Sequence, residues 1–219
     1  RSDVRECQAE GGVIVDLCDV KGKFYGKAFY SDKSQIALRM VTASDEIVER
    51  EFWLSRLKMA ISLREKTVSG TEVCRLVNGE GDGIPSVIVD RYKDVLSIQT
   101  LCQGSEKIKG LIAEILSELI NPVSIIERND GKVSDLEGLP RQVSLLKGED
   151  PGEIICLEND LKFIFHPSSG QKTGAFLDQR ENCLAMRRYA RGARVLDGHC
   201  YIGQWSCHAA LAGAASVLG

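Results

Sequence analysis

Two stretches near the end of this 219-residue chain carry the residue types best suited to hold a ligand. The first reads Gly170-Gln-Lys-Thr-Gly-Ala-Phe-Leu-Asp-Gln-Arg180, and the second, Arg194-Val-Leu-Asp-Gly-His-Cys-Tyr-Ile-Gly203, follows one helix-length later. Glycines on both sides of Lys172 and Thr173 give the first stretch the backbone freedom to approach a ligand closely. The second stretch is a short apolar strand that ends in Asp197 and turns through glycine into a helix. This combination is typical of a nucleotide-binding site.

The second stretch also indicates which groups a ligand could offer. A strand that turns through glycine into a helix presents backbone N–H groups and the positive end of the helix dipole. Asp197 adds a fixed acceptor for an ammonium or hydroxyl group, and a carboxylate so close to the turn disfavours a purely phosphate-binding loop. Gly203 alone is a weak signal, because a glycine can follow any strand. The chain has neither a G-x-G-x-x-G motif nor a G-K-S/T loop, which argues against an NAD-binding or kinase-like protein.

Taken together, the two stretches resemble the large-subunit rRNA methyltransferase I family. These enzymes depend on S-adenosylmethionine (SAM), and their motifs read GQKTG-x-x-LDQR and VLD-x-x-CY-x-G. The chain departs from the family pattern at His199, where an aromatic residue such as Phe is usual, and at Gln204, where a second glycine is usual. The resemblance implies SAM as cofactor and the following cofactor-binding residues: Lys172, Thr173, Phe176, Asp178, Arg180, Asp197, Cys200, Tyr201 and Gly203. For Asp178 the alternative is a capping box with Glu181 at the start of a helix.

The N-terminal part is predicted to be a small barrel or half-barrel. Residues 11–42 read as three short strands, with a hairpin turn at Asp19-Val-Lys-Gly22. The segment resembles the later part of a PUA domain, the RNA-binding barrel with which the same family begins. Its lysines alternate with aromatic residues, and Lys21, Lys23 and Lys27 are therefore candidates to bind RNA. The alternative is a solvated strand face over a small aromatic core.

A connecting helix is predicted over residues 45–66, with these inner positions: Ile47, Phe52, Leu54, Leu57, Ile61 and Leu63. The run Gly79-Glu-Gly-Asp-Gly83 resembles a phosphate cradle, but its two carboxylates would repel phosphate, so a tight turn between strands is favoured. Ser105 is predicted to cap an amphipathic helix that Asn121-Pro122 ends. With strands at 73–78, 84–92, 95–101, 123–127 and 142–146, these segments form an α/β module whose acidic surface suits a spacer or dimer face.

The last part begins with a predicted hairpin, strands 153–157 and 161–165, which delivers the chain to Gly170. A basic helix follows, and its Arg187 and Arg188 either suit the helix dipole or reach RNA phosphate.

The expected fold class is α/β with α+β elements. Its parts are a β-barrel-like PUA remnant (1–45), a connecting helix (46–72), a central α/β domain (73–152), and a hairpin with the first part of a Rossmann-like class I methyltransferase domain (153–219). Compared with the family pattern, stretches at both ends are expected to be missing.

Composition favours a soluble, cytoplasmic protein without a membrane partner. The apolar fraction is 43%, no apolar run of about 18 residues exists, and the first residues carry no signal-peptide core. Eight cysteines without a C-x-x-C pair indicate reduced thiols. No metal is expected, because the spacing of His199, Cys200, Cys207 and His208 matches no common zinc pattern.

The net charge of −3 is unevenly distributed. Residues 1–66 carry 12 basic and 11 acidic groups, residues 67–169 carry 10 and 17, and residues 170–219 carry 6 and 3, giving +1, −7 and +3. Nucleic acid is therefore expected to meet the two ends of the chain and to avoid its middle.

The resemblance implies transfer of a methyl group from SAM to C5 of a cytosine in large-subunit rRNA. That chemistry uses a cysteine thiolate that adds at C6, followed by methyl transfer and loss of the C5 proton, on a base that has left its stack. The nucleophile is expected beyond Gly219, because Cys200 falls in the cofactor turn and Cys207 in a helix, so no catalytic residue is assigned. Ribosomal RNA is the implied partner, and a homodimer is a further expectation. The competing hypothesis is a non-catalytic RNA-binding module with a vestigial nucleotide loop.

Overall fold

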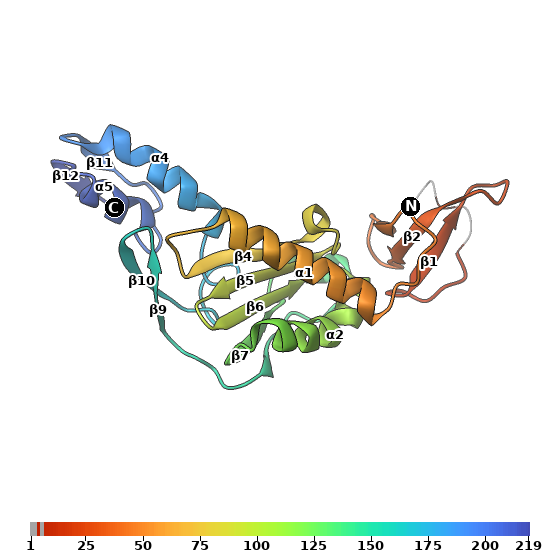
Figure 1. Cartoon of the computed structure of the whole chain (residues 1–219). Helices are drawn as coiled ribbons and strands as arrows, with labels where there is room; N and C mark the ends of the chain where they lie inside the picture. The colour runs from red at the N-terminus through yellow and green to blue at the C-terminus, as the bar shows by residue number, and fades with distance from the viewer. Residues whose placement is uncertain (1–3, 5–6) are drawn as a thin grey trace.

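The computed structural model describes Val4 and residues 7–219. Three parts follow one another along the molecule (Figure 1): a small N-terminal sheet, a central sheet covered by two helices, and a C-terminal part built from a hairpin, helices and two short strands. Within the described ranges, no helix combines the length and the apolar character needed to cross a lipid bilayer.

The N-terminal sheet contains the three predicted strands. β1 (Ile14–Cys18), β2 (Phe24–Tyr30) and β3 (Leu38–Thr42) pair antiparallel in the order β1-β2-β3. The Asp19 carboxylate closes the β1–β2 turn by accepting hydrogen bonds from the backbone N–H groups of Lys21 (2.8 Å) and Lys23 (3.0 Å). Gly22 has a φ of +80°, which explains why a glycine stands late in this turn. The predicted hairpin is confirmed.

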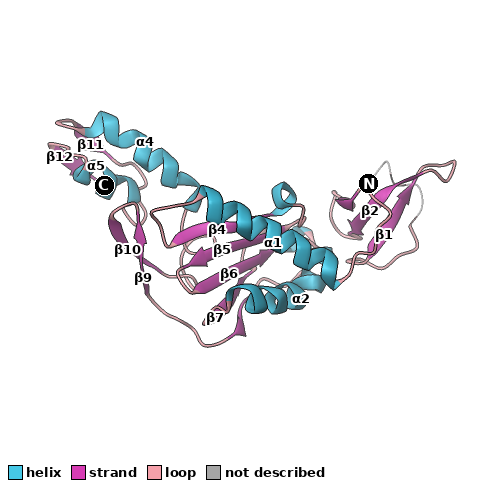
Figure 2. Cartoon of the chain, viewed as in Figure 1, coloured by secondary structure: helices cyan, strands magenta, loops and turns pink. Residues whose placement is uncertain are grey.

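The central sheet has five strands: β4 (Val73–Asn78), β5 (Val87–Tyr92), β6 (Val95–Thr100), β7 (Ser124–Arg128) and β8 (Val143–Lys147). They lie in sequence order, and only β6 and β7 pair in parallel, because α2 (Gln103–Ile120) crosses between them. α1 (Arg50–Thr67) and α2 cover one face of this sheet (Figure 2). The buried core between them includes Leu57, Val89, Ile98, Ile112 and Leu116. A short helix, α3 (Val133–Leu136), precedes β8.

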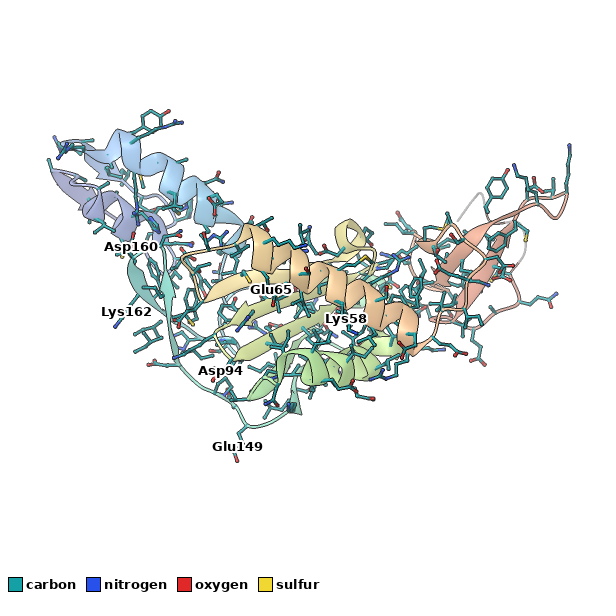
Figure 3. All side chains as sticks on the ribbon, viewed as in Figure 1. Lys58, Glu65, Asp94, Glu149, Asp160 and Lys162 are labelled. Atoms are coloured by element: carbon teal, nitrogen blue, oxygen red, sulfur yellow. The ribbon has the colours of Figure 1, made fainter. Side chains whose placement is uncertain are left out.

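The inner face of α1 differs from the prediction at both ends. Ile47 is 77% exposed, because the helix begins only at Arg50. Leu63 is 50% exposed, because the buried stripe passes instead through Trp53, Leu57 and Ala60. Lys58 and Glu65, which are labelled on α1 in Figure 3, are exposed.

The glycine-rich run after β4 is the predicted turn, formed as a single 3-10 turn, η1 (Gly79–Asp82). Its two carboxylates bond to other parts of the protein and stabilise the fold. Asp82 pairs with both terminal nitrogens of Arg64 on α1, the longer contact being 2.8 Å, and Glu80 accepts a hydrogen bond from the Ser86 backbone (3.2 Å).

Ser105 does not cap α2 as predicted. The helix begins at Gln103, so Cys102 is the N-cap and Ser105 is the third residue of the helix. The two residues form a reciprocal capping pair: the Cys102 backbone N–H donates to Ser105 Oγ (3.1 Å), and the Ser105 N–H donates to Cys102 Sγ (3.4 Å). Sulfur is a weaker acceptor than the oxygens usual at this position, so the sequence pattern does not indicate a cysteine as the cap.

The C-terminal part follows the predicted order. β9 (Ile154–Glu158) and β10 (Leu161–Phe165) form the antiparallel hairpin, and its inner side chains pack against Tyr92 and Ile126 of the central sheet. η2 (Leu177–Gln179) and α4 (Arg180–Ala190) lead to β11 (Arg194–Leu196). α5 (Gln204–Leu211) then returns the chain to β12 (Ser216–Leu218), which pairs parallel with β11.

Candidate cofactor site

The first motif stretch forms a loop, residues 166–176, that folds back on itself. The N–H of Gly170 donates to the carbonyl of His166 (2.7 Å), and the N–H of Gly174 donates to the carbonyl of Gln171 (2.9 Å). A Cβ on Gly170 would lie 2.8 Å from the Gly174 carbonyl oxygen and 3.0 Å from the Tyr201 hydroxyl. Glycine is therefore required here by the packing of the loop itself, whereas the sequence suggested that it serves close approach to a ligand.

Thr173 and Gly174 face the central sheet. The Thr173 side chain is fully buried, and its hydroxyl donates a hydrogen bond to the Asp90 carboxylate. Gly174 has a φ of +137°, and a Cβ there would lie 2.9 Å from the Tyr92 hydroxyl. Burial, and then the nearby Asp90 charge, raise the pKa of Tyr92 well above its usual range, so this hydroxyl is neutral. The Thr173 side chain therefore points into the protein, and its predicted contact with the cofactor stays a prediction.

Tyr201 brings the two motif stretches together. Its hydroxyl accepts a hydrogen bond from the Gln171 backbone N–H (2.9 Å) and donates to the Gly174 carbonyl (3.3 Å). The Tyr201 ring also meets Phe176 edge-to-face, with 5.7 Å between ring centroids. Residues 30 positions apart in sequence therefore form one surface.

Lys172 and Asp178 complete this surface. Lys172 Nζ lies 4.2 Å from the centroid of the Phe176 ring and 3.7 Å from Asp178 Oδ1. Partial burial disfavours the charged form of Asp178, but the hydrogen bond from Gln179 and the charge of Lys172 outweigh it, so the pKa of this carboxyl lies below its usual value. The site therefore carries an ionised acid and a cation beside an aromatic ring.

The alternative role of Asp178, a capping box with Glu181, does not occur in the structure. Asp178 lies in η2, and the N-cap of α4 is Gln179, which makes no side-chain capping bond. The 3-10 turn moves the helix start past Asp178, and Glu181 pairs instead with Arg180 (2.8 Å). Arg180, a predicted cofactor ligand, is therefore already paired with Glu181.

The second motif stretch forms the turn between β11 and α5. Asp197 Oδ2 accepts hydrogen bonds from the Ser206 N–H (3.0 Å) and hydroxyl (2.6 Å), which fixes the turn to the start of the helix. Tyr201 (φ +49°) and Gly203 (φ +74°) are both left-handed, and Gly203 is the N-cap of α5. Cys200 is half-buried in the same turn.

A cleft of about 360 Å³ opens beside this turn. Its lining residues come from α4, β11, the turn and α5: Met186, Val195, Leu196, Asp197, Gly198, His199 and Trp205. The volume of this cleft lies near the lower end of the range of small-molecule sites, and its lining mixes apolar and polar residues. Of the predicted cofactor residues, only Asp197 lines this cleft. Met186 and Trp205 belong to helices, where single apolar residues carry no recognisable signal in the sequence.

The predicted RNA-binding residues differ in how accessible they are. The ammonium of Lys27 contacts Asp16 (2.8 Å) and Asp45 (3.3 Å), and its side chain is only 17% exposed. Arg187 Nε donates to His208 Nδ1 (2.9 Å), and its Nη2 donates to the Asn159 carbonyl (2.6 Å). Both side chains are thus half-buried, and their charged groups already have partners in the protein.

The remaining candidates reach solvent. Lys21 and Lys23 are exposed at the β1–β2 turn, and Lys23 Nζ lies 5.2 Å from the Tyr25 ring centroid. On α4, the Arg188 guanidinium lies 4.7 Å from the centroid of the Tyr189 ring, which is 69% exposed. Basic groups are therefore paired with exposed aromatic rings at both ends of the chain.

All eight cysteines are free thiols. Burial raises the pKa of Cys156 and of Cys183 to about 12, and burial also raises the pKa of Cys74. A nucleophilic or metal-binding cysteine needs a stabilised thiolate, so these three are unsuited to either role. Across Val4 and residues 7–219, no three His, Cys, Asp or Glu side chains gather as metal ligands do.

Comparison with known proteins agrees with the motifs. Residues 2–43 match the family model of a PUA-like domain. The chain is 36% identical over 213 residues to ribosomal RNA large subunit methyltransferase I of Alteromonas mediterranea, and 37% identical over 210 residues to the protein of the same name from Shewanella amazonensis. These matches cover 96% and 94% of this chain but 54% and 53% of the relatives, so the chain spans about half their length. The predicted resemblance to this family is confirmed.

Two solved structures share the fold. A candidate SAM-dependent methyltransferase from Streptococcus mutans superposes with a TM-score of 0.81 at 22% identity, covering 95% of this chain and 54% of that one. A candidate methyltransferase in complex with S-adenosylhomocysteine (SAH) superposes with a TM-score of 0.82 at the same identity and coverage. The expected α/β fold class, with its PUA-like start, is confirmed.

Proposed function

We propose that this chain carries the cofactor-binding part of a SAM-dependent methyltransferase that acts on large-subunit ribosomal RNA. The observation that carries the proposal is the joining of the two motif stretches by Tyr201, next to a turn that holds Asp197 and lines a cleft. The sequence similarity to relatives named as such methyltransferases supports the reaction class and the RNA.

The residues present fit such a cofactor. SAM offers a purine ring, ribose hydroxyls, an ammonium, a carboxylate and a sulfonium, and when bound it supplies the electrophilic methyl group. Asp197 can accept from a hydroxyl or ammonium, and Phe176 and Tyr201 offer apolar ring surface. Lys172 can pair with a carboxylate. The left-handed turn before α5 adds backbone groups at a helix start.

For the RNA, we propose contacts at the two ends of the chain. Lys21 and Lys23 beside Tyr25, and Arg188 beside Tyr189, combine a cation with an exposed ring, which suits phosphate contact and base stacking on single-stranded RNA. Lys27 and Arg187 are assigned to holding the fold, because their charged groups already have partners.

The finer proposal is methylation at C5 of a cytosine, which the family resemblance implies. This reaction needs a cysteine thiolate that adds to C6 and a base that removes the C5 proton. We place the nucleophile outside Cys74, Cys156 and Cys183, since burial keeps these thiols protonated. A homodimer and a cytoplasmic location are expectations that accompany this function.

Titration of SAH into the 219-residue chain by isothermal calorimetry tests the proposal. We expect micromolar binding that Asp197→Ala abolishes. Asp94→Ala, which removes an exposed carboxylate on the central domain (Figure 3), is the matched control and leaves the affinity unchanged. Absence of SAH binding, together with retained binding of an rRNA fragment, would favour the non-catalytic RNA-binding module instead.

A further inference from the structure

The face of the central sheet opposite α1 and α2 carries buried polar side chains. Side chains alternate between the two faces of a strand, so Val87 and Val89 of β5 pack against the helices while Asp90 and Tyr92 point the other way. On β7, Ile125 joins the helix-side core and Arg128 lies on the opposite face. The hairpin β9–β10 and the loop 166–176 cover this second face.

Asp90 connects the sheet to the loop. Its carboxylate is fully buried and forms a two-pronged ion pair with Arg75 of β4, with contacts of 2.9 and 3.0 Å. A buried carboxylate is costly unless its oxygens are satisfied. A further donor comes from the Thr173 hydroxyl, 83 residues away in sequence, which is itself completely buried. Asp90 therefore ties the centre of the loop to β5.

Arg128 makes a second connection at the start of the loop. Its guanidinium donates to the Pro167 carbonyl (2.6 Å) and the Gly170 carbonyl (2.7 Å), and its side chain is 3% exposed. Asp130, 3.1 Å away, balances the charge. A planar guanidinium that bonds two carbonyls at once fixes their relative position in a way that a lysine cannot.

We propose that Asp90 and Arg128 are positioning residues that fix the geometry of the loop 166–176 from the central sheet. The central domain is then part of the cofactor site, where its sequence suggested a spacer or dimer face. The inference rests on the proposed function only in treating this loop as a cofactor loop. Asp90 and Arg128 act through Thr173 and through the carbonyls of Pro167 and Gly170, and the loop in turn presents Lys172 and Phe176.

Hydrogen–deuterium exchange on the whole chain tests the positioning without any ligand. Thr173→Val keeps the shape of the side chain but removes the hydroxyl, and Thr173→Ser restores it. We expect the amides of Gly170, Gln171 and Gly174, which are all hydrogen-bonded, to exchange at least about tenfold faster in Thr173→Val and within about twofold of wild type in Thr173→Ser. The amides of β5 and β6 serve as internal controls and should not change.

Arg128→Lys gives an independent test, because it keeps the positive charge but loses the planar group that donates to both carbonyls at once. We expect it to accelerate exchange in the same loop amides by at least about tenfold, so the proposal can be judged even if Thr173→Val does not fold. Unchanged loop exchange in both variants would overturn the proposal. SAH titration separates the positioning role from the proposed function. If the chain binds no SAH and loop exchange is still faster in the variants, the positioning role is supported and the cofactor role is refuted. If exchange is faster but the variants keep the wild-type affinity for SAH, the link between loop geometry and cofactor binding is overturned.

Discussion

Gly174→Ala tests whether the loop must pack against Tyr92 to bind the cofactor. A φ of +137° is accessible mainly to glycine, and an alanine there costs on the order of 1–3 kcal/mol. The new Cβ would also lie 2.9 Å from the Tyr92 hydroxyl and 3.2 Å from the Pro167 Cα. Tyr92 is fully buried against Phe165, with 5.3 Å between ring centroids, and cannot move aside freely. Overpacking of this kind costs about 1–3 kcal/mol more.

Gly174→Ala therefore destabilises this conformation of the loop by at least about 2 kcal/mol in total. If SAH needs that geometry, its affinity should fall by at least about 30-fold, since 1.4 kcal/mol corresponds to tenfold. Calorimetric titration of SAH measures the change. Gly152→Ala is the control, because Gly152 also has a positive φ (+59°) but no atom within 4 Å of the added Cβ. Wild-type affinity in Gly174→Ala would show that the loop is not held against Tyr92 during binding.

Three further predictions concern thiols, a buried ion pair and RNA. Burial raises the pKa of Cys183 to about 12, so only about one part in 10⁴ of this thiol is thiolate at pH 8. Cys183 should therefore react with iodoacetamide far more slowly than the exposed Cys207, as measured by mass spectrometry. Equal rates would contradict the burial of Cys183. Asp82→Asn should lower the free energy of unfolding by about 3 kcal/mol in urea titrations, because Arg64 loses its counter-ion in a largely buried position; a loss under 1 kcal/mol would show that water reaches the pair. Lys23→Ala should weaken binding of an rRNA fragment and reduce the salt dependence by about one unit, and an unchanged slope would place the RNA elsewhere.

The elements of the fold follow largely from local sequence patterns. The hairpin β9–β10 follows from two apolar runs around Glu158-Asn-Asp160, and in the structure Asn159 and Asp160 adopt the left-handed turn that such residues tolerate. The end of α2 follows from Asn121, which adopts the left-handed conformation after the helix. These signals lie within a few residues of what they specify, which is why they can be recognised in one sequence.

The inner face of α1 could not be derived in the same way. Its polar Arg64 turns inward to reach Asp82 and the Arg75 carbonyl, while the apolar Leu63 faces solvent. A helical pattern of apolar residues cannot show which polar residue has a buried partner elsewhere. The predicted helix start at residue 45 is wrong for a simpler reason, since helix starts without a side-chain cap leave little trace in the sequence.

The candidate site shows the same limit more strongly. The motif stretches identify Lys172, Phe176 and Tyr201 as neighbours of one surface, yet the hydroxyl that makes Thr173 distinctive is bonded to Asp90, in a strand far earlier in the chain. The local sign is the Asp90 carboxylate directly after the apolar run Val87-Ile-Val, a position where a buried charge requires partners.

That buried charge also bears on how the parts of the molecule depend on one another. The Arg75–Asp90 pair lies entirely within the central sheet, so it can form before the loop 166–176 is in place. The loop cannot bury Thr173 until the sheet exists, because the hydroxyl finds its partner only there. An isolated piece that contains both motif stretches but not the central domain would therefore lose the anchors from Asp90 and Arg128 and keep only the Tyr201 contacts. It should bind SAH much more weakly than the whole chain, even though every predicted cofactor ligand is present.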